Sequence, residues 1–159
     1  MRRLIAAALP LLAITLAAKA WALNLPPVIE PMTIKECGAC HMVFPPQLLP
    51  ARSWTALMGN LANHFDEIAT LDASTLAAIT GYLTANAADA PVNAGKFDRL
   101  LRGVLDTGMP LRITEMPWFK RRHGEVSTAA FARPNVKSAA NCVACHTGAD
   151  KGVFREPGD

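Results

Sequence analysis

The chain has 159 residues, among them 16 Lys or Arg, 13 Asp or Glu, four His and four Cys. This length fits one domain or two small ones. No dense basic tract is interleaved with aromatic residues, so the composition argues against a nucleic-acid partner.

The first 22 residues predict a secretory signal peptide. Met1-Arg2-Arg3 is a short basic start, residues 4–18 form an apolar run, and Ala20-Trp21-Ala22 has the small-x-small form of a cleavage site. A retained membrane anchor is the alternative, but the run is shorter than the roughly 20 residues that a spanning helix needs. We therefore expect cleavage near residue 22 and no stable membrane insertion afterwards.

Charge is unevenly distributed in the predicted mature chain. Residues 23–90 carry two basic and six acidic side chains, a net charge of −4, and residues 91–159 carry eleven basic and seven acidic ones, a net charge of +4. Such a dipole can orient a docking partner at long range in a salt-sensitive way.

Helical periodicity dominates, and alternating strand patterns are scarce. The first half predicts a helix over residues 34–41, a proline-rich loop, a helix over residues 51–65 and a third helix capped by Asp72. In the second half we expect helices over residues 96–105 and 117–123, the latter with Pro117 at its start and Gly124 after its end. A last helix should begin near residue 138.

A Pro-, Gly- and Asn-containing stretch at residues 90–95 separates two periodic segments. It predicts an N-terminal domain over residues 23–90 and a C-terminal domain over residues 91–159.

The string Cys-x-x-Cys-His occurs twice, at residues 37–41 and 142–146, and these two copies use all four cysteines. Positions i, i+3 and i+4 share one face of a helix, so both sulfurs and the imidazole can point at one flat macrocycle. The string is the attachment signature of c-type haem. It predicts two haem c groups, with thioether bonds to Cys37, Cys40, Cys142 and Cys145 and iron ligation by His41 and His146.

Two disulfides, or one zinc site of four thiolates, would be the other uses of the cysteines. Disulfides do not require a histidine after each second cysteine, and two such matches by accident in an exported chain are improbable. Because c-type haem is attached on the far side of the bacterial inner membrane, the motif and the predicted signal together indicate the periplasm.

A low-spin haem iron takes a second axial ligand, and two histidines remain. His64 lies 23 residues after His41, and His123 lies 23 residues before His146. We predict local pairing, His41 with His64 and His123 with His146, although spacing alone also permits a crossed assignment. Methionine is the competing ligand and would raise the reduction potential. The candidates are Met58, Met109 and Met116.

Aromatic and basic side chains near the motifs have structural interpretations. We expect Trp54, Phe65 and Tyr82 to line the first haem pocket and Trp118 and Phe119 the second. Haem propionates could be paired by Arg121, Arg122, Arg133 and Lys137, although solvated surface charge is an equal alternative.

The assembled residues resemble the small periplasmic dihaem cytochromes c. The matching segments cover nearly the whole mature chain: residues 36–42, 48–54, 63–65, 79–83, 86–89, 113–119, 133–134, 136–138 and 141–146. The resemblance implies an N-terminal domain like a class I cytochrome c, a less regular, mainly helical C-terminal domain, and two bis-histidine haems packed close together.

The leading functional hypothesis is electron transfer, because an iron with two protein ligands has no open position for a substrate. The resemblance implies another haem protein as partner, and we expect a redox protein of the periplasm or inner membrane and a monomeric chain. The alternatives are a dihaem peroxidase-like enzyme, although that class has much longer chains, and a gas-binding haem module.

Overall fold

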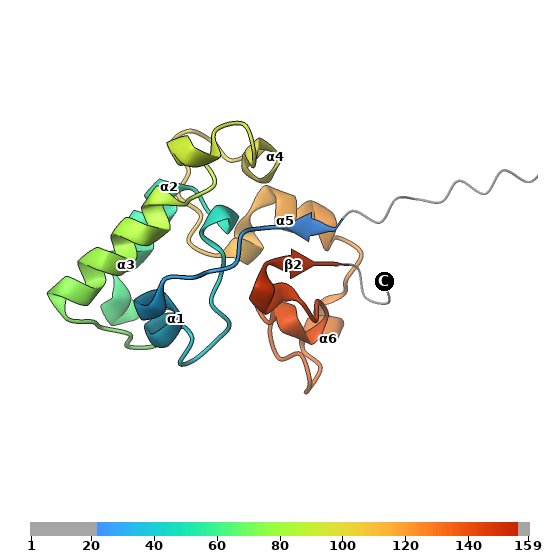
Figure 1. Cartoon of the computed structure of the whole chain (residues 1–159). Coiled ribbons are helices and arrows are strands. Elements are labelled where there is room, and N and C mark those ends of the chain that lie inside the picture. Colours follow the sequence, from blue (N-terminus) through green and yellow to red (C-terminus); the bar gives the residue numbers. More distant parts are fainter. Residues whose placement is uncertain (1–21, 156–159) are drawn as a thin grey trace, which may run out of the picture.

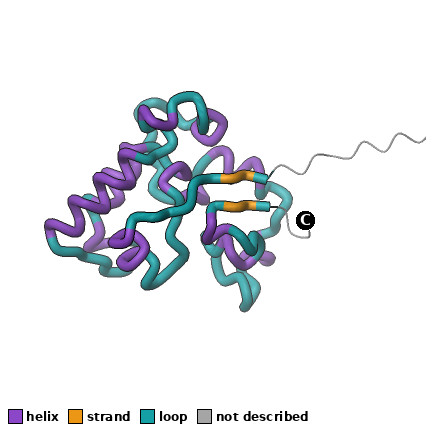
Figure 2. The backbone as a smooth tube through the Cα atoms, viewed as in Figure 1, coloured by secondary structure: helices purple, strands orange, loops and turns teal. Residues whose placement is uncertain are grey.

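The computed structural model describes residues 22–155, so the predicted signal peptide lies outside the described residues except for Ala22. The described chain is mainly helical, as predicted, with two short strands (Figures 1 and 2). The helices and strands are β1 (Leu23–Asn24), α1 (Pro31–Cys37), α2 (Ala51–Met58), α3 (Ala73–Ala85), α4 (Asp98–Leu101), α5 (Pro117–Arg122), α6 (Thr128–Phe131) and β2 (Val153–Phe154).

Helix α1 begins three residues earlier and ends four residues earlier than the sequence predicts. Glu30 caps it, because its carboxylate accepts hydrogen bonds from the backbone N–H groups of Met32 and Thr33, and Pro31 occupies the first turn. The helix ends at Cys37. Only the first cysteine of the motif is therefore helical, and His41 follows in a turn.

Helix α2 is much shorter than the predicted 51–65 helix. It ends at Met58, with Gly59 as its C-cap, and a short 3₁₀ turn then leads to His64. The next two residues have left-handed backbones, with φ of 56° at Phe65 and 76° at Asp66. Positive φ at two successive positions makes a tight turn rather than a helix. It places His64 opposite Glu67, with which it exchanges two backbone hydrogen bonds of 2.8 and 3.2 Å.

The third predicted helix is present as α3, with Asp72 as its N-cap. One carboxylate oxygen of Asp72 accepts hydrogen bonds of 3.0 Å from the backbone N–H groups of Ser74 and Thr75. Hydrogen bonds from the Ser74 and Thr75 side chains, together with these backbone bonds, stabilise the ionised form and hold the pKa of Asp72 well below its ordinary value. Helix α3 packs mainly against α2 and also contacts α1.

The C-terminal half contains shorter helices than predicted. Helix α4 covers only four residues of the predicted 96–105 segment, whereas α5 matches its prediction, with Pro117 in its first turn and His123 as its C-cap. The predicted final helix from residue 138 is wrong. Only a 3₁₀ turn forms there, at Cys142–Ala144, after a left-handed Lys137 with φ of 67°.

The two ends of the described chain pair with each other. Strands β1 and β2 are antiparallel, with Leu23 opposite Phe154 (Figure 1). The turn before β2 contains Gly152, whose φ is 79°, and a Cβ atom there would collide with the carbonyl oxygen of Leu25. A glycine therefore permits the close approach of the two segments.

The hydrophobic core contains residues from both sides of the predicted boundary at 90–95. Met116 and Phe119 belong to the same buried cluster as Leu49, Trp54 and Ile79. A second buried cluster joins Leu25, Leu48 and Ala88 to Phe97 and Leu100. The two halves therefore share buried apolar surface.

Arg52 adds polar contacts between the halves. Its guanidinium donates hydrogen bonds to the backbone carbonyls of Gly108 at 2.6 Å and Leu105 at 2.9 Å, and it lies 3.5 Å from the Asp89 carboxylate. The other Asp89 oxygen accepts a 2.7 Å hydrogen bond from the N–H of Ala51, the first residue of α2. The start of α2 is thus tied to the segment that follows α4.

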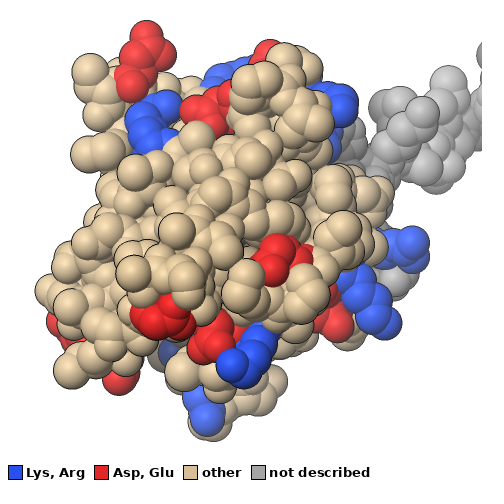
Figure 3. Space-filling view, turned by 60° about the vertical axis from the view of Figure 1, so that its left-hand side comes forward, with Lys and Arg blue, Asp and Glu red and all other residues tan. Residues whose placement is uncertain are grey.

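The face that Figure 3 shows is mainly uncharged, with scattered charged groups of both signs. Between residues 22 and 155, no helix is long and apolar enough to cross a membrane.

Two candidate haem sites

The structure brings the four histidines together as two pairs. The ring centres of His41 and His64 lie 6.2 Å apart, and those of His123 and His146 lie 6.1 Å apart. These are the local pairs that the sequence predicts. In each pair, one histidine closes a Cys-x-x-Cys-His motif and the other comes from a distant turn or helix end.

The separation of each pair fits a metal ion between the rings. An imidazole nitrogen lies about 2 Å from the metal that it ligates, and the ring centre lies about 1 Å behind that nitrogen, so two imidazoles on opposite sides of one metal have centres about 6 Å apart. The observed spacings match this value. Stacked rings in direct contact lie closer, as the 4.0 Å between Phe119 and His123 illustrates, whereas an edge-on pair such as His146 and Phe154 is 5.9 Å apart.

Hydrogen bonds select the tautomer of three of the four histidines. The Nδ1 atoms of His41, His123 and His146 contact the backbone carbonyl oxygens of Met42, Phe119 and Arg155 at 2.6, 3.0 and 2.5 Å, respectively. A carbonyl can only accept, so each Nδ1 carries the proton and each Nε2 keeps its lone pair. This arrangement is typical of metal-ligating histidines, in which the second ring nitrogen donates to a carbonyl or carboxylate.

The surroundings of the fourth histidine, His64, favour its neutral form. Burial, followed by the nearby His41 and Arg112, lowers its pKa. A neutral imidazole is the form that binds a metal. Its neighbour Phe65 packs 4.8 Å away and carries the Arg112 guanidinium over its ring at 3.9 Å. A small cavity of about 60 Å³, lined in part by His64, Phe65 and Leu57, adjoins this pair.

The two pairs differ in the relative orientation of their rings. The planes of His41 and His64 are 26° apart, whereas those of His123 and His146 are 85° apart. In the second pair, Phe119 stacks on His123 with an angle of 16° between the rings, and His146 lies edge-on to Phe154 at 5.9 Å. The imidazole planes are therefore closer to parallel at the first site and nearly perpendicular at the second.

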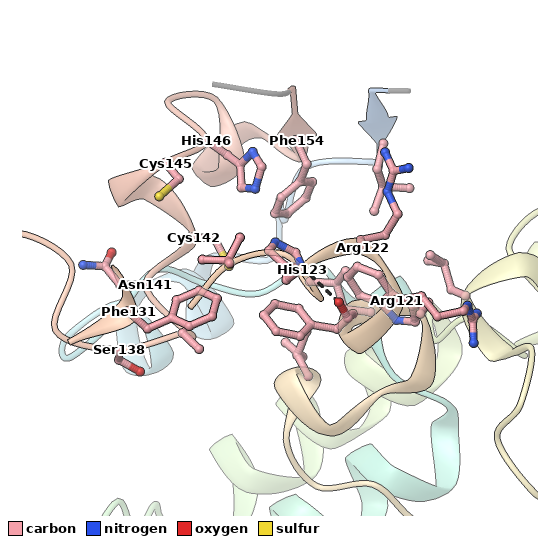
Figure 4. A pocket seen from close by; sticks show the side chains of 18 of the residues that line it. Arg121, Arg122, His123, Phe131, Ser138, Asn141, Cys142, Cys145, His146 and Phe154 are labelled. Atoms are coloured by element: carbon pink, nitrogen blue, oxygen red, sulfur yellow. Dashed lines mark hydrogen bonds between the residues drawn. The ribbon is translucent and has the colours of Figure 1, made fainter. Parts of the chain in front are cut away.

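The second pair lies in a cavity of about 390 Å³, within the size range of small-molecule and cofactor pockets. Phe119 and Phe131 lie on its wall, and Cys142, Cys145, His123 and His146 all line it (Figure 4). The buried indole N–H of Trp118, another lining residue, has no hydrogen-bond partner among the described groups.

The first cysteine of each motif, Cys37 or Cys142, is partly buried, whereas Cys40 and Cys145 are exposed. Burial raises the pKa of Cys37, and it raises the pKa of Cys142 to about 11. All four thiols are free of disulfide bonds. In the described part of the chain, no three or more His, Cys, Asp or Glu side chains gather into a metal site.

None of the methionine candidates lines either of these two cavities. Met58 and Met116 are buried in the main hydrophobic cluster, and Met109 is largely exposed. Trp54 is also a core residue, with its indole N–H bonded to the Pro46 carbonyl at 2.7 Å. These side chains stabilise the fold around the sites.

The basic side chains are only partly where the sequence suggests. Arg121 and Arg122 line the larger cavity, but Arg133 and Lys137 do not, and Arg99 and Arg102 were missed. No motif marks Arg99 or Arg102. Their position depends on the packing of α4 against α5, which sequence periodicity does not predict.

Comparisons with known proteins agree with this geometry. The dihaem cytochrome c family model matches residues 33–154. A diheme cytochrome c from Rhodobacter sphaeroides is 50% identical, with a TM-score of 0.73, and the match covers 81% of this chain and 99% of that one. Another, from Shewanella baltica OS155, is 36% identical, with a TM-score of 0.62 and coverage of 77% and 85%. No curated protein matches.

A mainly helical fold with two Cys-x-x-Cys-His motifs defines a c-type cytochrome. More specifically, the chain belongs to the dihaem cytochrome c family. It carries two covalently attached c-type haems, and its four cysteines lie two in each Cys-x-x-Cys-His motif.

Proposed function

We propose that this protein transfers electrons between redox partners through two haems, each ligated by two histidines. His41 and His64 hold the first iron, and His123 and His146 hold the second. The observation that carries the proposal is the spacing of about 6 Å within each pair of rings, which leaves room for one metal ion and a protein ligand on both of its sides.

When bound, each haem supplies an iron that alternates between the ferric and ferrous states. The protein's residues keep the surroundings of that iron constant. Backbone carbonyls fix three of the imidazoles through Nδ1, and buried apolar residues such as Met116 and Phe119 support the sites from the core. Two histidines that would hold each iron in both oxidation states would keep the rearrangement on reduction small, which suits fast transfer.

The partner in this proposal is another haem or redox protein, and the location is the periplasm. Export is supported by the signal-like residues 1–22 and by the attachment motifs themselves. Electron-transfer partners meet through small, transient interfaces, so we expect the transfer rate to fall with rising salt if charge steers the encounter.

The deciding experiment is the low-temperature electron paramagnetic resonance (EPR) spectrum of the oxidised holoprotein. Two low-spin bis-imidazole signals are the expected result, together with little or no carbon monoxide binding after reduction. A high-spin signal or a His/Met signal would contradict the assignment for that haem. An open iron would redirect attention to catalysis or gas binding there.

A further inference from the structure

The larger cavity has a strongly cationic end. Four arginines line it, Arg99 and Arg102 from α4 and its C-cap and Arg121 and Arg122 from α5. None of its described lining residues is Asp or Glu. Helices α4 and α5 pack against each other, and the Arg121 guanidinium is anchored by two 3.3 Å hydrogen bonds to the backbone carbonyl of Arg102. The Arg121 guanidinium is therefore fixed in position by the backbone at the end of α4.

Arg121 and Arg122 lie across the cavity from the cysteines. In Figure 4, Cys142 and Cys145 lie on one side, Arg121 and Arg122 lie on the other, and His123 and His146 lie between them. The ends of the cavity thus differ in chemistry, with two thiols facing two guanidinium groups across the histidine pair.

This polarity matches the chemistry of a c-type haem. The two vinyl groups that form thioethers are on adjacent pyrroles, and the two propionates are on the other two pyrroles. A macrocycle attached at Cys142 and Cys145 therefore presents its carboxylates at the opposite edge. Guanidinium groups bind carboxylates well because their planar fork matches the two oxygens.

We propose that Arg121 and Arg122 form a carboxylate-binding subsite for the propionates of the second haem. Arg99 and Arg102 reinforce its positive charge. The proposal rests on the proposed function, since it requires a haem between His123 and His146. It assigns the arginines that line the cavity a role in setting the redox potential.

The test compares redox titrations of the wild-type and Arg122→Gln holoproteins. EPR monitors each titration, so that the midpoint potential of each iron is measured separately. A nearby positive charge favours the ferrous state, so its loss lowers the midpoint potential. At a separation of about 10 Å we expect roughly a tenfold change in the ferrous-to-ferric ratio of the second haem, which corresponds to about 59 mV for one electron. The first haem should move much less.

Two variants serve as matched controls. Lys120→Gln removes one positive charge from the same helix at an exposed position outside the cavity lining, and Arg133→Gln removes an arginine that does not line the cavity. If these controls shift the midpoint potential of the second haem equally, the effect comes from general surface charge and the proposal is overturned. Arg122→Lys keeps the charge, so the midpoint potential of the second haem should stay close to its wild-type value.

The pH dependence of the potential gives a second readout. A guanidinium lowers the pKa of a paired carboxylate, so the inflection of potential against pH should move to higher pH in Arg122→Gln. An unchanged inflection would count against pairing. If Arg122→Gln loses the second haem, Arg121→Gln is measured instead. A wild-type holoprotein with fewer than two haems would refute the proposed function itself, whereas two haems without a selective shift would refute only the subsite.

Discussion

The different ring orientations at the two sites lead to a prediction about Phe119. Its ring stacks 4.0 Å from the His123 ring at an angle of 16°, and its own carbonyl accepts the His123 Nδ1 proton. The side chain therefore restrains the imidazole plane that lies 85° from that of His146. Replacing Phe119 by Leu removes the flat surface but keeps the backbone acceptor.

The size of the effect follows from the stacking energy. An aromatic pair of this kind contributes about 1 kcal/mol, which corresponds to roughly a fivefold preference for the observed orientation. Phe119 is also buried, at 7% exposure, and we expect Phe119→Leu to lower the free energy of unfolding by about 1–2 kcal/mol.

EPR is the assay, because the iron senses the ligand planes. Parallel imidazoles act on one of the two iron d orbitals that can accept π donation, whereas perpendicular imidazoles act on both and leave their energies closer. The wild-type protein should therefore give two distinct low-spin signals, of which the more anisotropic belongs to the second haem. Phe119→Leu should broaden or shift that signal alone.

Phe97→Leu is the matched control, since Phe97 is a similarly buried phenylalanine in the other hydrophobic cluster. It should cost similar stability and leave both signals unchanged. Identical spectra for wild type and Phe119→Leu, or one common signal for both haems, would refute this reasoning.

Three further outcomes are expected. His64→Ala should let the reduced protein bind one carbon monoxide per chain, which absorption spectra detect; binding equal to that of the wild type would count against His64 as a ligand. His64→Met should raise one of the two midpoint potentials, measured by redox titration, if the sulfur ligates. Met116→Ala should lower the free energy of unfolding by about 2–5 kcal/mol, because Met116 is fully buried. As a control, Met109 is exposed, and Met109→Ala should change this free energy by less than about 0.5 kcal/mol. Equal urea unfolding midpoints for the two variants would contradict this prediction. Arg52→Lys should cost about 1–3 kcal/mol, because lysine cannot reproduce the forked bonds to two backbone carbonyls, and an unchanged unfolding midpoint would show that these bonds contribute little.

Short-range sequence signals predicted the chemistry and the best-capped helices. Each haem motif is five consecutive residues, so its identity does not depend on the rest of the fold. Asp72 and Pro117 also act locally, through hydrogen bonds or backbone geometry within one turn, and both helices start where these residues predict. The pairing of His64 and His123 with the nearer motif was predicted from equal spacing, and the structure places the rings accordingly.

Helical periodicity was misleading near the haem sites. The stripe that ends in His64 and Phe65 reads as one helix, yet Phe65 and Asp66 adopt left-handed backbones that a helix excludes. The second motif has the spacing of a helix face, but only a 3₁₀ turn over Cys142–Ala144 forms there, with Cys145 as its C-cap. Apolar spacing reports which residues face a buried surface, and here that surface includes the haem pocket as well as polypeptide.

The sequence by itself determined the cofactor class, the attachment residues and the set of four histidines, because these depend on residue type and local spacing. Only the tertiary structure decided which arginines meet at one cavity, how the imidazole planes are oriented, and that Met116 and Phe119 share a core with the N-terminal half. Those features arise from contacts between segments far apart in the chain, whose packing no local pattern specifies.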